Sequence, residues 1–405
     1  MQQKVPTVII IGAGLGGLTF YHALIKNKDK KEFKVKIFER ESGPQATPNP
    51  IPNLEYHGFS LADHTGSLLL RPPSKQVKDI YEVANLTTSF SIIITYRNRL
   101  RDVLLENVPV QWGKKCIGYE ETDVGVWVLF EDGSKEFCDI LVGADGVNSP
   151  VRKQKLPELQ IFDYGVTMII TDVAAPKNLL DRLIKLNGNE QENFENKNET
   201  YYRATIAYVY PTKLDDKHDE HKVDDEDLAS IVNHVKYYIR KLRPECEMTN
   251  IVLELWDLVP KMTPDSKKYP FKTYNPLRRR KMRDIDPLSI NTWTNSRVTL
   301  LGDAAHATSP VLGIGANNAI EDAETLSKAL LNYSPENYIS CIKEYENEML
   351  KRNSADVLRS RFIALGQASQ VGYISSIFRN NFIRIINFIM NFFDLNFLFR
   401  NVRKN

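Results

Sequence analysis

Three separated stretches of the chain each join an apolar run to glycine, and two of them also carry aspartate. The first, VIIIGAGLGGL, begins at Val8; the second is DILVGADGVNSPVR at Asp139–Arg152; the third is RVTLLGDAAHATSPVLGIGANNAIED at Arg297–Asp322. Glycine permits tight turns and close approach of the backbone to a ligand, and an ionised aspartate accepts hydrogen bonds from hydroxyl groups. These residue types suit a nucleotide that is held by distant parts of the chain.

The first stretch contains a G-x-G-x-x-G fingerprint between a β-branched run and a helical pattern. Gly12 permits the turn, Gly14 lets the backbone approach a pyrophosphate, and Gly17 allows close packing of helix on strand. Glu39 follows the next predicted strand and should accept the ribose hydroxyls, which favours FAD or NAD over NADP. The residues expected to bind the cofactor here are Gly12, Ala13, Gly14, Leu15, Gly16, Gly17, Glu39 and Arg40.

The other two stretches carry further polar candidates. Asp145 follows an apolar run and forms an Asp-Gly turn, so it either contacts a ligand or only shapes the turn. Arg152 either serves phosphates or pairs with an acid. Asp303 is placed to accept a ribityl hydroxyl. We interpret His306 as structural, because its turn would orient a cofactor and not a substrate.

In this combination the chain resembles the FAD-dependent aromatic hydroxylases, the single-component flavoprotein monooxygenases that include salicylate hydroxylase-like, p-hydroxybenzoate hydroxylase-like and tetracycline-inactivating enzymes. The second and third stretches resemble that family's DG and GD motifs, and Arg97 in YRNRLRDVL resembles its R-x-x-L segment, with Arg99 and Arg101 close by. Ile314 stands where many members have Gln. The resemblance adds these cofactor-binding residues: Arg97, Asp145, Gly302, Asp303, Pro310, Gly313, Gly315, Ala316 and Asn317.

The resemblance implies an FAD-dependent monooxygenase that uses dioxygen and hydroxylates a small electron-rich substrate, aromatic or polyketide-like, through a flavin C4a-hydroperoxide. Only one Rossmann fingerprint is present, so NADH or NADPH would visit transiently as reductant. No catalytic base can be identified, and the histidines show no metal-binding spacing. Two alternatives stay open: an FAD-dependent reductase or dehydrogenase on the same scaffold, and a flavin-binding protein without turnover.

Hydrophobic periodicity predicts an α/β fold. It comprises a discontinuous Rossmann-like FAD-binding domain (1–160 and 285–335), an inserted, mostly β substrate domain (161–284) and a helical C-terminal region (336–405). Helical patterns occur at Leu15–Ile25, Tyr96–Glu106, Ala316–Leu331 and Ser334–Leu365. Strands are predicted at Val5–Ile11, Val35–Phe38, Ile140–Val142, Val166–Thr171, Ala204–Tyr210 and Ile251–Trp256, with a hairpin at Gly125–Cys138.

Composition limits the remaining possibilities. A net charge of +2 gives no general attraction to nucleic acid. The four cysteines lie far apart without a C-x-x-C pair, which suits a reducing compartment and predicts a cytoplasmic protein. Residues 381–405 are rich in Phe and Ile and end in basic residues. This tail either packs across the domains or attaches to a membrane surface. No oligomeric state is predicted.

Overall fold

The structure, a computed structural model, describes most of the chain. The described residues are 5–44, 61–63, 65, 67–70, 97–186, 201–215, 223–260, 277–368, 378–386 and 388. The tail beyond residue 388 lies outside them. The described residues fall into two compact units. The first takes its residues from Met1–Thr47, Thr95–Gly165 and Lys281–Ala368, and the second takes its residues from Pro48–Ile94, Val166–Arg280 and Ser369–Asn405.

A five-stranded parallel sheet forms the centre of the first unit. Its order is β13 (Val298–Leu300), β9 (Ile140–Gly143), β1 (Thr7–Ile11), β2 (Lys34–Phe38) and β5 (Val110–Gln111). All neighbouring pairs are parallel. The apolar runs of β1, β9 and β13 are almost wholly buried, as expected for strands covered on both faces. The predicted strands at Val5–Ile11, Val35–Phe38 and Ile140–Val142 are confirmed.

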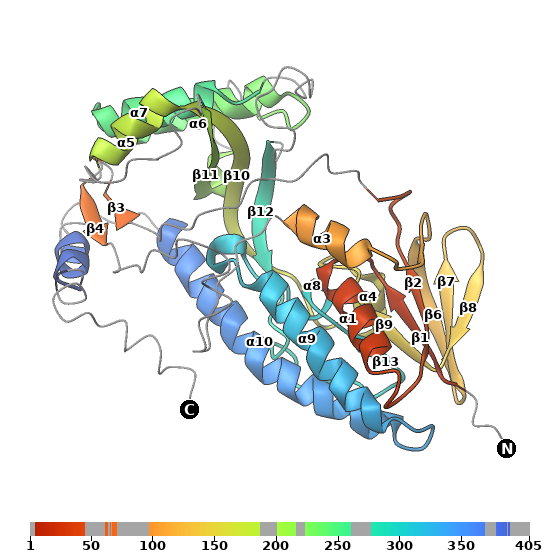
Figure 1. The fold of residues 1–405 in the computed structure, drawn as a ribbon. Helices are drawn as coiled ribbons and strands as arrows, with labels where there is room; N and C mark the ends of the chain where they lie inside the picture. The colour runs from red at the N-terminus through yellow and green to blue at the C-terminus, as the bar shows by residue number, and fades with distance from the viewer. Residues whose placement is uncertain are drawn as a thin grey trace. The chain divides into compact units, whose positions relative to one another are not determined.

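Helices and a second sheet cover this parallel sheet (Figure 1). The helices are α1 (Leu15–Lys26), α3 (Arg97–Leu105), α4 (Pro150–Lys155), α8 (Asp303–His306), α9 (Gly315–Ala329) and α10 (Tyr338–Ala368). The antiparallel sheet is β6 (Cys116–Thr122), β7 (Gly125–Phe130) and β8 (Lys135–Cys138). The predicted hairpin is confirmed, and Gly133 in its turn has a φ of +81°.

Helix α10 runs beside α9 within the first unit (Figure 1). It buries Tyr345, Met349 and Val357 completely, and Tyr345 donates a hydrogen bond of 2.8 Å to the carbonyl oxygen of Leu300 in β13. Residues 338–368 therefore continue the body of the first unit, whereas the sequence placed them in a separate C-terminal region.

The second unit combines helices with most of a three-stranded sheet, of which residues 162–165 and 281–284 belong to the first unit. The sheet order is β11 (Tyr201–Pro211), β10 (Phe162–Pro176) and β12 (Arg278–Asp284), and the helices are α5 (Lys177–Leu186), α6 (Leu228–Leu242) and α7 (Glu247–Asp257). The prediction of a strand at Ile251–Trp256 is wrong, because α7 covers it. Ile251 and Leu255 lie one helical turn apart and are both buried. The interpretation of this region as mostly β needs the same correction, since three helices share its core.

Candidate functional site

Four polar segments follow four neighbouring strands of the parallel sheet. The glycine loop follows β1, Glu39 follows β2, Asp145 follows β9 and Asp303 follows β13. Because the strands are parallel, all four segments emerge at the same edge. In open α/β sheets, ligands bind at this carboxyl edge where the strand order reverses. Sequence reasoning named members of all four segments, and the sheet brings them to one edge.

Backbone contacts join the three glycine motifs directly. The amide of Ala144 donates to the carbonyl of Ile11 at 2.8 Å, and the amide of Leu301 donates to the carbonyl of Gly143 at 2.9 Å. A Cβ on Gly16 would lie 2.4 Å from a methyl of Leu301 and 3.2 Å from Cβ of Ala319. The first motif therefore packs against the second and the third, although most of the chain separates them in sequence.

The glycines of the first loop differ in how closely other protein atoms approach them. Gly12 has a φ of +108°, and a Cβ there would lie 2.3 Å from the carbonyl oxygen of Ala144; a Cβ on Gly17 would lie 2.1 Å from the carbonyl oxygen of Gly12. Packing alone requires both glycines. Gly14 differs, because its φ is −82° and no protein atom lies within 4 Å of a Cβ built on it. No described residue requires glycine at Gly14, which points to a ligand that approaches its backbone.

The end of β2 and the start of α3 contact this loop. Glu39 is buried, and its Oε2 accepts a hydrogen bond of 2.8 Å from the amide of Ala13. Arg40, beside it, is exposed, as is Arg97 at the first position of α3. Arg101, one turn later, donates from Nε to the carbonyl of Ala13 at 2.8 Å. Sequence reasoning placed only Arg97 in the site, and the helical spacing of the two arginines was the available signal for Arg101.

The carboxylate of the half-buried Asp145 accepts no hydrogen bond of standard geometry from the described residues, although the Ser149 hydroxyl lies near it. Both oxygens are inaccessible, and neither accepts a hydrogen bond within the described structure. Burial raises the pKa of Asp145 to about 6, although the Ser149 hydroxyl, nearby backbone amides and the charge of Arg152 favour the ionised form. Buried polar groups are normally paired. An unpaired carboxylate at a strand end beside Gly12 is therefore a position where a ligand donor would be expected.

Arg152 holds the second and third motifs together. It is almost fully buried in α4, and its Nη1 donates to the carbonyl of Val147 at 2.7 Å and to that of Ala304 at 3.5 Å. Burial lowers the pKa of Arg152, while the charge of Asp145 raises it. The sequence left two roles open for Arg152, contact with phosphates or pairing with an acid. In the structure Arg152 joins two backbone segments and lies near the acid Asp145.

Asp303 opens α8 directly after Gly302, which has a φ of +62°. The Asp303 side chain is exposed, yet desolvation by the surrounding protein raises its pKa, against the lowering effect of the charges of His306 and Arg97. A Cβ on Gly315 would lie 3.8 Å from Oδ1 of Asp303. Asp303 thus lies beside the start of α9. Arg97 is near enough for its charge to lower the pKa of Asp303.

The start of α9 carries the rest of the third motif. Pro310 begins a short 3-10 turn, Gly313 adopts the left-handed conformation with a φ of +64°, and Ala316 and Asn317 are exposed in the first helical turn. No side chain caps the amino ends of α1 or α9. Their free N–H groups and positive dipole ends are suited to stabilise negative charge on a ligand.

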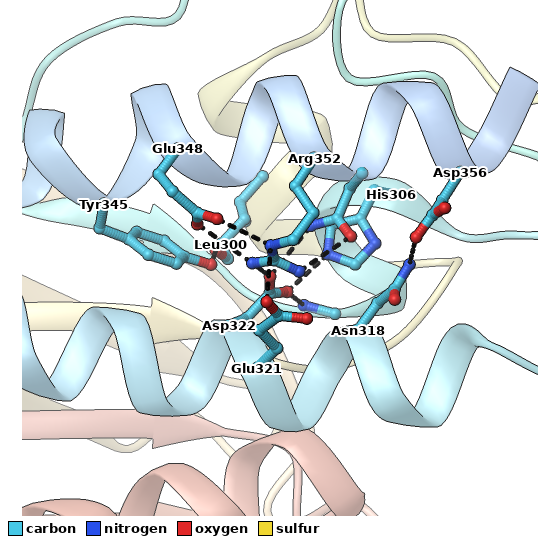
Figure 2. A network of polar contacts seen from close by, with 11 residues as sticks. Leu300, His306, Asn318, Glu321, Asp322, Tyr345, Glu348, Arg352 and Asp356 are labelled. Atoms are coloured by element: carbon cyan, nitrogen blue, oxygen red, sulfur yellow. Dashed lines mark hydrogen bonds and ion pairs between the residues drawn. The ribbon is translucent and has the colours of Figure 1, made fainter. Parts of the chain in front are cut away.

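Buried Asp322 of α9 anchors the turn between β13 and α8 (Figure 2). It accepts hydrogen bonds from the amide of Gly302 at 2.9 Å, from Arg352 at 2.9 Å and from Asn353 at 3.0 Å, and Nε2 of His306 lies 2.5 Å from it. Burial would raise the pKa of Asp322, but His306, Gly302 and Arg352 lower it overall. These contacts agree with a structural role for His306. Sequence reasoning missed Asp322, which no local signal distinguishes from a surface acid.

This site fits FAD better than a smaller nucleotide. It offers two uncapped helix ends, an open side at Gly14 and the unpaired oxygens of Asp145, with Asp303 exposed beside α9. One helix end suits a pyrophosphate, and the second suits the polar edge of a flavin ring.

Comparisons with known proteins support this assignment. Residues 269–360 match a family described as an FAD binding domain, and residues 10–83 match an NAD(P)-binding Rossmann-like domain. The chain is 28% identical to the FAD-dependent monooxygenase thnD of Trichoderma harzianum, over 87% of this chain and 92% of that protein. It is 24% identical to 6-hydroxynicotinate 3-monooxygenase of Pseudomonas fluorescens, over 87% and 90% of the two chains.

Solved structures share the fold. The HpxO protein of Klebsiella pneumoniae, complexed with FAD and uric acid, aligns with a TM-score of 0.65 at 20% identity, covering 95% of this chain and 94% of that one. A salicylate hydroxylase substrate complex aligns with a TM-score of 0.62 at 18% identity, covering 96% and 95%.

Fold, site and family matches together define an α/β flavoprotein oxidoreductase with FAD as its cofactor. The resemblance predicted from the three motifs is confirmed, and the chain is a homologue of the FAD-dependent monooxygenases that include aromatic hydroxylases.

Proposed function

We propose that this protein is a monooxygenase that uses NADH or NADPH and dioxygen to hydroxylate a small electron-rich substrate. The observation that carries the proposal is the convergence of the three motifs at one edge of the parallel sheet, beside the unpaired carboxylate of Asp145. Homologues named as monooxygenases of 6-hydroxynicotinate and of 3-amino-4-hydroxybenzoate support an aromatic substrate.

In this proposal the first unit binds the cofactor through the residues predicted from the sequence. The backbone at Gly14 and the start of α1 hold the pyrophosphate, Glu39 binds the adenosine ribose, and Asp303 binds the ribityl chain. Bound FAD would accept hydride from the nicotinamide and activate dioxygen. The backbone around Gly315 and Asn317 would stabilise negative charge on the ring, because the uncapped start of α9 presents its N–H groups there.

The burial of the surrounding chain contributes by excluding water. Gly12, Ala13 and Leu301, which line the motif contacts, are buried, as is Arg152. Rigid, water-poor surroundings strengthen electrostatic interactions and protect reactive intermediates from side reactions.

The test uses the purified full chain with FAD bound. We expect substrate-stimulated oxidation of NADH or NADPH and incorporation of one atom of isotopically labelled dioxygen into the product. Oxidation of the nicotinamide with a reduced, unlabelled product would instead identify a reductase or dehydrogenase. Bound FAD that neither nicotinamide reduces would identify a flavin-binding protein without turnover.

We also propose a cytoplasmic location, with small-molecule substrate and dioxygen as partners. The cysteines support it: Cys116, Cys138 and Cys341 form no disulfide in the described structure, as a reducing compartment would leave them. Fractionation of the source cells should recover the protein outside secretory compartments.

A further inference from the structure

The sequence left the place of residues 381–405 open between packing on the domains and contact with a membrane. Residues 378–386 and 388 are helical and are called the tail helix below. Its large apolar side chains face solvent: Phe378 is 73% exposed, Phe382 64%, Ile385 56% and Phe388 67%. No helix in the described part of the chain is both long and apolar enough to cross a membrane.

The exposed side chains form one stripe along the tail helix. Phe378, Phe382 and Ile385 follow each other at spacings of four and three residues, which places them on the same helical face. Exposed apolar residues normally occur singly on a soluble protein, and a contiguous group indicates a binding surface. We therefore expect a binding partner to cover this stripe of apolar side chains and shield it from water.

The charges next to the stripe identify the occupant. Arg379 and Arg384 are the charged residues of the tail helix, and both are exposed; Arg384 also pairs with Asp63 at 3.2 Å. Over residues 378–405 the sequence has five basic residues and one acidic residue, and seven of the chain's 18 phenylalanines. A helix with an aromatic face and arginines beside it lies in the interface of an anionic lipid bilayer.

We infer that the tail helix docks on the surface of a membrane that contains anionic phospholipid. The rings of Phe378 and Phe382 enter the boundary between headgroups and acyl chains, while Arg379 contacts lipid phosphates. The helix lies in the plane of the surface and does not span the bilayer. This inference does not depend on which reaction the flavin site performs.

The experiment is co-sedimentation of the full, FAD-containing chain with vesicles. Phosphatidylcholine vesicles that contain phosphatidylserine should bind the protein, and pure phosphatidylcholine vesicles should bind it more weakly. The double variant Phe378→Ser, Phe382→Ser should lose about a hundredfold in affinity, because each buried ring contributes about a factor of ten. Phe362→Ser removes a ring that is 81% exposed on α10 and should bind as the unchanged protein does.

A charge variant tests the electrostatic half of the inference. Arg379→Gln should bind the anionic vesicles about fivefold more weakly, since each basic residue near an anionic surface contributes about that factor. Arg359→Gln on α10, also an exposed arginine, is the matched control and should change nothing. Retained FAD absorbance in every variant shows that the fold is intact.

Three results would overturn the inference. Wild-type protein that stays in the supernatant with anionic vesicles would refute it outright. Equal binding to both kinds of vesicle would refute the role of charge. A concentration-dependent dimer in solution that only the double phenylalanine variant abolishes, without vesicle binding, would assign the stripe to a second copy of the chain.

Discussion

Half-buried carboxylates in the two units have opposite surroundings. In the first unit, Asp145 lies at a strand end and accepts no hydrogen bond within the described structure. In the second unit, Asp215 accepts a hydrogen bond of 2.9 Å from Tyr210 and forms an ion pair with Arg279, which also pairs with Asp225 at 3.0 Å. The second unit satisfies this charge internally, whereas the carboxyl edge of the first unit leaves one unpaired among the described residues.

Glycines at the carboxyl edge show the same distinction. Packing against the protein accounts for Gly12 and Gly17, but Gly14 has open space where a side chain would be. A position that the protein itself does not constrain, next to an unpaired carboxylate, has the properties of a ligand site. Gly12 and Gly17 are explained by packing within the protein, whereas Gly14 is better explained by a ligand that approaches its backbone.

The largest effect should follow Gly14→Val. Valine is compatible with the extended backbone at Gly14, so the fold should persist, but its side chain would fill the space where the pyrophosphate approaches. We expect the purified variant to contain no FAD, measured by flavin absorbance against protein concentration. Gly43→Val, at another glycine with open space around it, should keep its FAD. Normal FAD content in Gly14→Val would show that the loop is misassigned.

Next in size is Asp322→Ala. The change removes a buried carboxylate and leaves His306 and Arg352 without their shared partner, which should cost about 3–5 kcal/mol of unfolding free energy. Urea unfolding measures it. Glu324→Ala on the same helix removes only an exposed pair with Lys328 and should change stability by less than about 0.5 kcal/mol. Similar losses in both variants would contradict the role given to Asp322.

Asp145→Asn should act through pH. The folded pKa of Asp145, about 6, exceeds the ordinary aspartate value, so the folded apo-protein binds this proton more tightly than the unfolded chain. Its ionisation therefore destabilises the apo-protein increasingly as pH rises from about 4 to about 6. Asn removes that cost. We expect the free energy of unfolding of the variant to exceed that of the unchanged protein by about 1–3 kcal/mol at pH 7 and to equal it at pH 4.

Urea unfolding of the two apo-proteins at both pH values measures this difference. A constant difference between the proteins across the range would mean that Asp145 titrates normally and that its carboxylate is not left unpaired.

The smallest effect should come from the second unit. Tyr210→Phe removes the hydroxyl that donates to Asp215 and accepts from Arg279, at a cost of about 1–2 kcal/mol in unfolding free energy. FAD affinity, measured by titrating apo-protein, should stay unchanged. Tyr201→Phe, at an exposed tyrosine, controls for the loss of a hydroxyl. Loss of FAD affinity without loss of stability would remove the contrast between the units.

The sequence predicted those parts of the fold that short segments determine. The β-branched run of β1 and the glycine spacing after it are local signals, as are the apolar runs of β9 and β13. Ile251–Trp256 was misjudged because a short apolar run fits a strand and a buried helix equally well. Residues 251–256 form a helix because they pack in a core that they share with residues of α5 and α6.

The sequence predicted the segments that form the candidate site, but not the side chains that hold those segments in place. Glycine and aspartate at motif spacing located the strand ends, and parallel pairing then brought them together. The contacts of Asp322 with Gly302 and of Arg101 with Ala13 depend on tertiary structure, and the helical spacing from Arg97 was a local signal for Arg101 alone. The unpaired state of Asp145 is likewise a property of the folded chain.

A crystal structure of the protein grown with FAD tests the central claim most directly. We predict a pyrophosphate at the backbone of Gly14 and the start of α1, with the ribityl chain at Asp303 and the flavin ring at the start of α9. A dinucleotide at α1 with no ligand atom near Asp303 or Gly315, or FAD bound elsewhere on the chain, would contradict the account.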